Sequence, residues 1–275
     1  MSRTKPRPER EQEPVVERVR IRYAKRGRLK FTSHRDFARA LERAVRRADV
    51  PIAFSSGFSP HPKISYASAA PTGVASEAEY LEIGLRARME PDALRAALDA
   101  ALPPGLDVLE AVEAHGSDFA DRMTASQWRI ELPSVTDEQA TEAVAAFLAA
   151  TEVSVERLTK SGRRTMDARS PVVLLAVTDR ADPAGDGVGN TTPQPVSGIG
   201  AMPCAILDLV VRHVTPSVRP DDVLTGLGVV AALAPPVPPR VTRLAQGSLR
   251  PGTRDEIVDP LAADRDRTVT GTPSP

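Results

Sequence analysis

Residues 19–66 read VRIRYAKRGRLKFTSHRDFARALERAVRRADVPIAFSSGFSPHPKISY, and this stretch decides the fold expected for the first half of the chain. Residues 34–48 place apolar side chains three and four residues apart, which predicts an amphipathic helix with one face toward a core. Ser33 precedes this helix as an N-cap, and Asp36 takes the position of a capping-box acid. Residues 19–31 alternate weakly between apolar and basic side chains around a glycine, which predicts a strand or a hairpin-like pair.

The remainder of the first half continues as two strands, a helix and a strand. An extended run begins after Pro51, breaks at a loop that contains glycine and proline, and then resumes. An alternating run, a short amphipathic helix and a closing strand follow. The predicted ranges are 52–54 with 63–67, 79–85, 90–102 and 106–112. Together with the first strand and helix they make the β-α-β-β-α-β order of the ferredoxin-like plan.

A similar order recurs downstream. Strands are predicted at 128–132, 153–158, 172–177, 205–211 and 241–245, and helices at 136–150 and 220–227. We therefore predict an α+β protein of two tandem ferredoxin-like halves, a basic one at 17–115 and a second at 127–246. Residues 179–203 lack periodicity and predict a mobile insert in the second half. Residues 1–16 and 247–275 are charged, rich in proline and poor in large apolar side chains, so flexible tails are predicted there.

Charge is segregated along the chain. The sequence has 36 basic and 36 acidic residues, so its formal net charge is zero. Between residues 20 and 63, however, twelve Lys and Arg residues stand against three acidic residues. One region can therefore bind a polyanion although the protein as a whole is neutral.

The cysteine content and the N-terminal segment indicate the compartment. Cys204 is the one cysteine of the sequence, which excludes an intrachain disulfide and any zinc or iron–sulfur cluster held by cysteines alone. Residues 1–18 lack the apolar core of a signal peptide, and no run of about 18 apolar residues occurs in the chain. We therefore expect a cytoplasmic protein that has no cofactor and no membrane as a partner.

Four motifs carry a resemblance to a known family. They are FTSHRD at 31–36, SGFSPHPK at 56–63, SEAEY at 76–80 and TPSVRPDDVL at 215–224. Through them residues 17–245 resemble the radical-SAM-associated proteins, whose activity is unknown and whose domain occurs alone or fused behind B12-binding radical SAM enzymes. The resemblance implies a radical SAM enzyme as the partner. The chain itself is not the radical generator, because one cysteine cannot hold a four-iron cluster.

The arginines of the predicted helix recur at helical spacing with few acidic residues among them. Exposed helices usually carry both acidic and basic side chains. The scarcity of acidic residues here therefore favours a phosphate-binding face over one that only contacts solvent. Basic residues of the adjoining strand and of the following loop extend the face. The predicted nucleic-acid-binding residues are Arg20, Arg22, Arg39, Arg43, Arg46, Arg47 and Lys63. Tyr23, Phe58 and Tyr66 either offer stacking surfaces nearby or pack into the core.

His34 and His61 are the candidates for chemistry. His34 is expected in the first turn of the helix, where the dipole favours a neutral imidazole that can act as a base or ligand, unless it packs beside the preceding strand. His61 stands between two prolines that restrict its direction, or is a turn residue without a role. We predict no metal site, because three or four convergent ligands are needed and the first half has few histidines.

Three functions fit these features. The preferred hypothesis is a non-catalytic RNA-binding or adaptor protein that acts with a radical SAM enzyme in the modification of RNA, with tRNA as one candidate. In the second, the protein is a metal-independent RNA endonuclease of ferredoxin-like fold, in which His34 or His61 is the general base and Arg20, Arg22 or Lys63 stabilises the phosphorane charge. In the third, the arginines of a protein-binding scaffold meet an acidic partner. No third convergent catalytic group is evident in the sequence, which favours an accessory protein over an enzyme.

Overall fold

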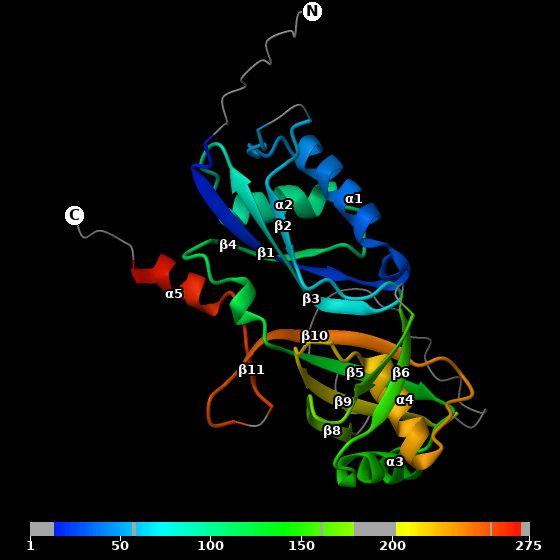
Figure 1. Cartoon of the computed structure of the whole chain (residues 1–275). Helices are drawn as coiled ribbons and strands as arrows, with labels where there is room; N and C mark the ends of the chain where they lie inside the picture. The colour runs from blue at the N-terminus through cyan, green and yellow to red at the C-terminus, as the bar shows by residue number, and fades with distance from the viewer. Residues whose placement is uncertain (1–13, 57–58, 160–161, 179–201, 254, 271–275) are drawn as a thin grey trace, which may run out of the picture. The chain divides into compact units, whose positions relative to one another are not determined.

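The computed structural model describes residues 14–56, 59–159, 162–178, 202–253 and 255–270 (Figure 1). The chain divides into two compact units, which we call unit 1 (Met1–Met123 with Asp259–Pro275) and unit 2 (Thr124–Val258). Most of the insert predicted at 179–203 lies outside the described residues, as do Phe58 and most of the predicted N-terminal tail. Among the described helices, none has the length and apolar character needed to cross a membrane.

Unit 1 follows the order β-α-β-β-α-β. Its main elements are β1 (Glu17–Lys25), α1 (His34–Arg47), β2 (Ile64–Ala67), β3 (Ala75–Leu85), α2 (Pro91–Ala101) and β4 (Val108–Glu113). The strands pair antiparallel in the spatial order β4-β1-β3-β2. The predicted mixture of helices and strands is confirmed, and strands and helices lie close to their predicted ranges.

The two faces of β1 have different surroundings because side chains alternate along a strand. Val19, Ile21 and Tyr23 are buried in the core that the sheet forms with α1 and α2. Burial of each such large side chain contributes about 1.5–3 kcal/mol to stability. Arg20 and Arg22 lie on the opposite face of the strand. That face has a second small core, which includes Leu261 from the end of the chain.

The predicted strand at 19–31 is wrong in its second part. Residues Gly27–Phe31 form a short 3-10 helix, η1, instead of extending the sheet. Gly27 has a φ of +54°, a left-handed conformation that takes the chain out of the strand direction at little cost for glycine. As a result Phe31 is 63% exposed rather than part of a sheet face.

The predicted tail at 247–275 is also corrected. Within it lie the end of β10 (Arg240–Leu249), the short strand β11 (Ile257–Val258) and the helix α5 (Ala262–Thr270). Leu261 and Asp264 have no exposed surface. Composition predicted disorder because this segment is short of large apolar residues, but the carboxylate of Asp264 is paired inside unit 1, as described below.

Unit 2 contains the helices and strands that follow unit 1 in the sequence, up to β11. They are β5 (Ala125–Pro133), α3 (Asp137–Ala149), β6 (Ser154–Thr159), β7 (Gly162–Asp167), β8 (Val172–Thr178), β9 (Cys204–Arg212), α4 (Pro220–Ala231), β10 and β11. The antiparallel strands run in the order β11-β10-β5-β9-β8. Thr136 caps α3 in a capping box with Gln139, and Pro220 opens α4 at its first turn, where a missing N–H costs nothing.

The strand predicted at 153–158 does not join the main sheet of unit 2. As β6 it pairs with β7, which the sequence analysis did not predict, in a separate two-stranded sheet. When this hairpin is set aside, unit 2 has the same β-α-β-β-α-β order as unit 1. Its sheet also places the fourth of these strands beside the first, the first beside the third and the third beside the second.

Gly226 in α4 marks a close approach of two helices. A Cβ at this position would lie 2.8 Å from Phe147 Cε2 of α3 and 3.1 Å from Val153 Cγ1. Phe147 is fully buried and cannot move aside freely. We expect Gly226→Ala to lower the free energy of unfolding by about 1–2 kcal/mol in urea denaturation, since overpacking outweighs the better helix propensity of alanine. Gly228→Ala in the same helix is the control and should cost less, because its Cβ would meet one backbone oxygen, Leu233 O, at 3.3 Å.

Candidate nucleic-acid interface

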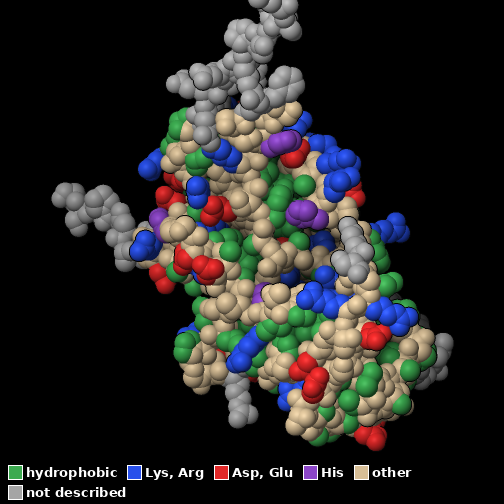
Figure 2. Space-filling view, in the orientation of Figure 1, with side chains coloured by type: hydrophobic (Ala, Val, Ile, Leu, Met, Phe, Trp, Pro, Cys, Tyr) green, Lys and Arg blue, Asp and Glu red, His purple; other side chains and the backbone are tan. Residues whose placement is uncertain are grey.

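Helix α1 presents its basic side chains opposite the side that it buries. The Ser33 hydroxyl caps the helix by accepting the Asp36 backbone N–H at 3.2 Å, as predicted, and it lies 2.7 Å from the Asp36 carboxylate. Phe37, Leu41, Ala44 and Val45 form the buried stripe. The outward face bears four exposed arginines, which we call the α1 crest: Arg35, Arg39, Arg43 and Arg46. Figure 2 shows Lys and Arg side chains gathered over this helix.

The α1 crest has little internal neutralisation. Arg46 lies 3.6 Å from Glu42 one turn earlier, in a pair whose arginine side chain is 71% exposed. Such surface pairs are worth about 0–1 kcal/mol. In the part of the chain that the structure describes, no ion pair is found for Arg35, Arg39 or Arg43. Their charges are therefore available to a partner from solution.

Arg20 is not part of this surface, and its predicted role in nucleic-acid binding is corrected. Its side chain is 0% exposed and lies 2.8 Å from the Asp264 carboxylate and 3.0 Å from Glu82. It also donates to the carbonyl oxygens of His115 and Gly116 and packs over the Phe119 ring, 4.6 Å from its centroid. All its donors are directed into unit 1, so Arg20 is a structural residue.

The other basic residues of β1 are also engaged within unit 1. Arg22 donates its Nε–H to the Glu77 carbonyl oxygen at 2.8 Å. Lys25 is buried and donates to the carbonyl oxygens of Ala70 and Pro71. These contacts leave the strand a poor phosphate-binding surface, although in sequence it looked as basic as the helix.

Arg26, which follows the strand, is paired as well. It bridges Glu77 and Asp107, and its hydrogen bonds to Glu77 are the largest influence that holds the pKa of the guanidinium above its ordinary value. This pairing connects the residue that precedes η1 to β3 and to the loop before β4. The excess charge of residues 20–63 is therefore exposed mainly on α1.

Neither Arg47 nor Lys63 belongs to the α1 crest. Arg47 is exposed but donates to the carbonyl oxygen of Ala101, the last residue of α2, at 3.1 Å. That contact places it on the side of α1 that faces α2. Lys63 is half-buried beside β2, and its backbone N–H and carbonyl oxygen bond to Ala53 and Gly84.

His34 lies on the side of α1 that faces β2. Its ring is 4.7 Å from the ring of Tyr66 in an edge-to-face arrangement, with an interplanar angle of 83°. Tyr66 also contacts Phe37 edge-to-face at 6.0 Å, and Phe37 stacks on Tyr23 at 4.4 Å. Burial, together with the negative charge of Glu42, raises the pKa of Tyr66 to about 12. His34 itself is exposed, so this aromatic column runs from the core to the surface.

His61 is exposed in the loop before β2. Its backbone N–H donates to Ser55 Oγ at 3.0 Å, and its carbonyl oxygen accepts from the Ser55 N–H. No contact between His61 and His34 occurs among the described residues. In the same described ranges, no group of three or more His, Cys, Asp and Glu side chains is arranged to hold a metal ion.

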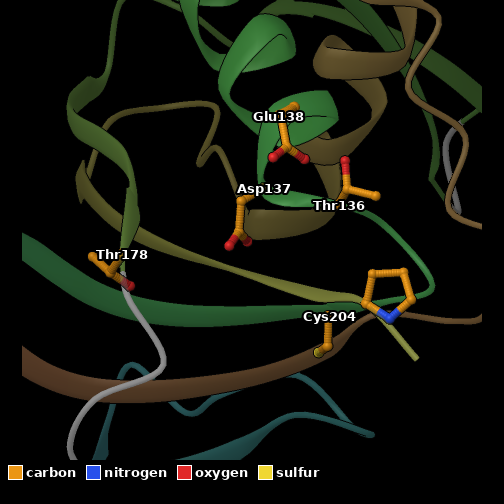
Figure 3. Close-up of a pocket in the computed structure, with 6 residues that line it drawn as sticks. Thr136, Asp137, Glu138, Thr178 and Cys204 are labelled. Carbon is orange, nitrogen blue, oxygen red and sulfur yellow. The ribbon is translucent and has the colours of Figure 1, made fainter. Parts of the chain in front are cut away.

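Unit 2 contains a cavity of about 330 Å³ that none of the predicted site residues line (Figure 3). It lies at the N-terminus of α3, and its lining residues are Thr136, Asp137, Glu138, Thr178, Pro203 and Cys204. Two carboxylates already occupy the positive end of this helix, which disfavours an anionic ligand. The backbone hydrogen bond at Glu138 lowers the pKa of its carboxyl group, so this carboxylate stays charged.

A serine–histidine pair in unit 2 was not predicted from the sequence. Ser126 Oγ lies 2.6 Å from His213 Nε2, across 87 residues of sequence. No local spacing could have indicated this pair. Ser126 is only 1% exposed, so its hydroxyl is not open to attack a substrate. The pair ties the start of β5 to the residue that follows β9.

Comparison with known families covers most of the chain. A family described as "Uncharacterized protein conserved in bacteria (DUF2344)" matches residues 18–220. The matched region contains α1, its basic crest and His34, and it extends through unit 2 to the start of α4. A search of curated proteins found no match to the sequence. The match spans well over half of the sequence, and the chain therefore belongs to the DUF2344 family of proteins conserved in bacteria.

Proposed function

We propose that the protein is a non-catalytic RNA-binding adaptor whose α1 crest contacts the phosphates of RNA. The observation that carries this proposal is the contrast between the two basic elements of unit 1. Arg20, Arg22 and Lys25 of β1 are engaged inside the unit, whereas α1 exposes four arginines on one face. A helix that only needs solvation usually mixes both signs of charge, and a row of arginines is the footprint expected for a phosphate chain.

The topology of the two units supports the ferredoxin-like part of the proposal. Each unit has the β-α-β-β-α-β order, and in each the fourth strand pairs with the first, the first with the third and the third with the second. We propose that both are ferredoxin-like halves, a fold used by many RNA-binding modules. This support comes from the analogy of fold.

The partner in this proposal is a radical SAM enzyme that modifies RNA. Its support is the resemblance of residues 17–245 to the radical-SAM-associated proteins. With one cysteine the chain cannot supply the thiolates of a four-iron cluster, so an adaptor would leave the radical chemistry to its partner. The role of the α1 crest in such a complex is to hold the RNA.

Salt dependence tests the phosphate contacts. The affinity of the intact chain for tRNA should fall with salt, and each phosphate contact adds about 0.7–0.9 to the slope of log K against log salt concentration. Arg39→Ala should reduce this slope by about that amount and weaken binding to all RNA sequences alike. Arg164→Ala, at an exposed site on β7, is the matched control and should leave the slope unchanged.

The same preparations decide between adaptor and endonuclease. End-labelled RNA should remain intact with the wild-type protein, because among the described residues neither the His34 ring nor the His61 ring has a hydrogen bond or ion pair that would orient it as a general base. Cleavage that is lost in His34→Ala or His61→Ala without a loss of RNA affinity would replace the adaptor proposal by the endonuclease. A slope that Arg39→Ala leaves unchanged would remove the crest from the interface.

A further inference from the structure

We infer that the side of α1 facing β2 receives an unpaired base, so that the RNA held by the α1 crest is single-stranded. The residues concerned are His34, Glu42 and Tyr66, which we call the α1 flank. This inference rests on the proposed function, because the crest supplies the phosphate contacts. It adds the class of RNA and the residues that would distinguish a base from a phosphate.

The position of the α1 flank follows from the helical period. At 3.6 residues per turn, His34 lies at the border of the buried stripe, and Glu42 lies between His34 and the arginines of the crest. Tyr66 approaches from β2 and meets the His34 ring at 4.7 Å. A strand of RNA with its phosphates on the crest could therefore turn its bases toward this side of the helix.

The aromatic column prepares His34 for stacking. The Tyr66 ring is held by Phe37 at 6.0 Å, and the Phe37 ring is in turn stacked on Tyr23 in the core.

 
The Tyr66 ring is fixed by these contacts, and the His34 ring beside it therefore loses little conformational freedom when a base stacks on it. His34 is exposed and is itself a residue type on which unpaired bases stack. Bases inside a duplex are already stacked and paired, so they cannot offer their faces to this ring.

The polar groups of the α1 flank suit a base and not a phosphate. Tyr66, with its pKa raised to about 12, keeps a protonated hydroxyl that can donate a hydrogen bond. The Glu42 side chain is 35% exposed, and its carboxylate is only loosely paired with Arg46 at 3.6 Å. A carboxylate accepts hydrogen bonds from the N–H groups of bases and repels phosphate oxygens. The crest therefore attracts the backbone while the flank excludes it and accepts a base.

Three probes of equal length test this inference on the full chain: a single-stranded RNA, the same strand without bases, and an RNA duplex. The wild type should bind the single strand most tightly. His34→Ala should weaken binding to the single strand by roughly 5- to 100-fold, the range expected for loss of one stacked base. It should leave the affinity for the abasic strand unchanged. His34→Phe keeps a ring at this site and should retain most of the affinity.

The outcomes separate this inference from the function on which it rests. Arg39→Ala should weaken binding to the intact and the abasic strand alike, since it acts on phosphates. If His34→Ala has no effect, or lowers the affinity for both strands equally, the base site is wrong while phosphate binding by the crest stands. Tighter binding of the duplex than of the single strand would overturn the inference too. Failure of the wild type to bind any of the three probes would overturn the proposed function itself.

Discussion

Arg39→Glu combined with Arg43→Glu should lower RNA affinity at low salt by a factor on the order of 10³ or abolish it, with no loss of fold. Both side chains are exposed on the α1 crest, one helical turn apart, and neither has an ion pair among the described residues. The double substitution replaces two attractions for phosphate by two repulsions. The buried stripe that holds α1 to the sheet is untouched, so circular dichroism and thermal unfolding should match the wild type.

The control for this variant changes charge by the same amount elsewhere. Arg163→Glu with Arg164→Glu alters two exposed arginines of β7 in unit 2. We expect at most a small loss of affinity from the change in overall charge. Equal RNA affinity of the α1 double variant and the wild type, measured by filter binding at low salt, would contradict the proposed interface.

Asp264→Ala should destabilise unit 1 by about 3–5 kcal/mol, the range found when one partner of a buried ion pair is removed. The Asp264 carboxylate is fully buried and accepts hydrogen bonds from Arg20 and Arg122, each at 2.8 Å, and from the His115 N–H at 3.0 Å. Without it two guanidinium groups lose their shared acceptor, and Arg20 has no route to solvent. Urea denaturation followed by circular dichroism, with hydrogen exchange of β1, would measure the effect.

Two further variants give reference values for the stability loss of Asp264→Ala. Asp121→Ala removes an exposed carboxylate of η2 (Ala120–Arg122) and should change stability by less than about 0.5 kcal/mol. Asp264→Asn keeps the shape and part of the hydrogen bonding, so its cost should fall between those of the other two. A loss below about 1 kcal/mol for Asp264→Ala would show that the C-terminal helix does not hold unit 1 together.

The local elements of this protein could be predicted because their causes are local. The buried stripe of α1 follows from apolar side chains three and four residues apart, and its start follows from the hydroxyl of Ser33. The β-α-β-β-α-β order of unit 1 came from the same periodicities. The exposed arginines of the α1 crest were predicted for the same reason, since the face opposite a buried stripe must meet solvent.

Other features depend on contacts that sequence spacing does not contain. Arg20 and Arg39 are the same residue type in one basic region, but Arg20 pairs with an aspartate 244 residues away and Arg39 does not. From the sequence, the face of β1 that bears Arg20 and Arg22 was expected to be basic and exposed to solvent, because no neighbouring segment supplies side chains that could cover it. In the structure the end of the chain supplies both the apolar Leu261 and the carboxylate of Asp264 to that face.

The amino-acid sequence by itself determined most of the helices and strands of the two units, where charge is concentrated, and that one cysteine cannot support a cluster. The tertiary structure alone decided which of the basic residues remain available to a ligand. The physical reason is that burying a guanidinium requires a carboxylate at hydrogen-bonding distance, and which carboxylate arrives is settled by chain topology. Only after Arg20, Lys25 and Arg26 are engaged inside unit 1 do the arginines of α1 stand out as a row of exposed cations on one helix face.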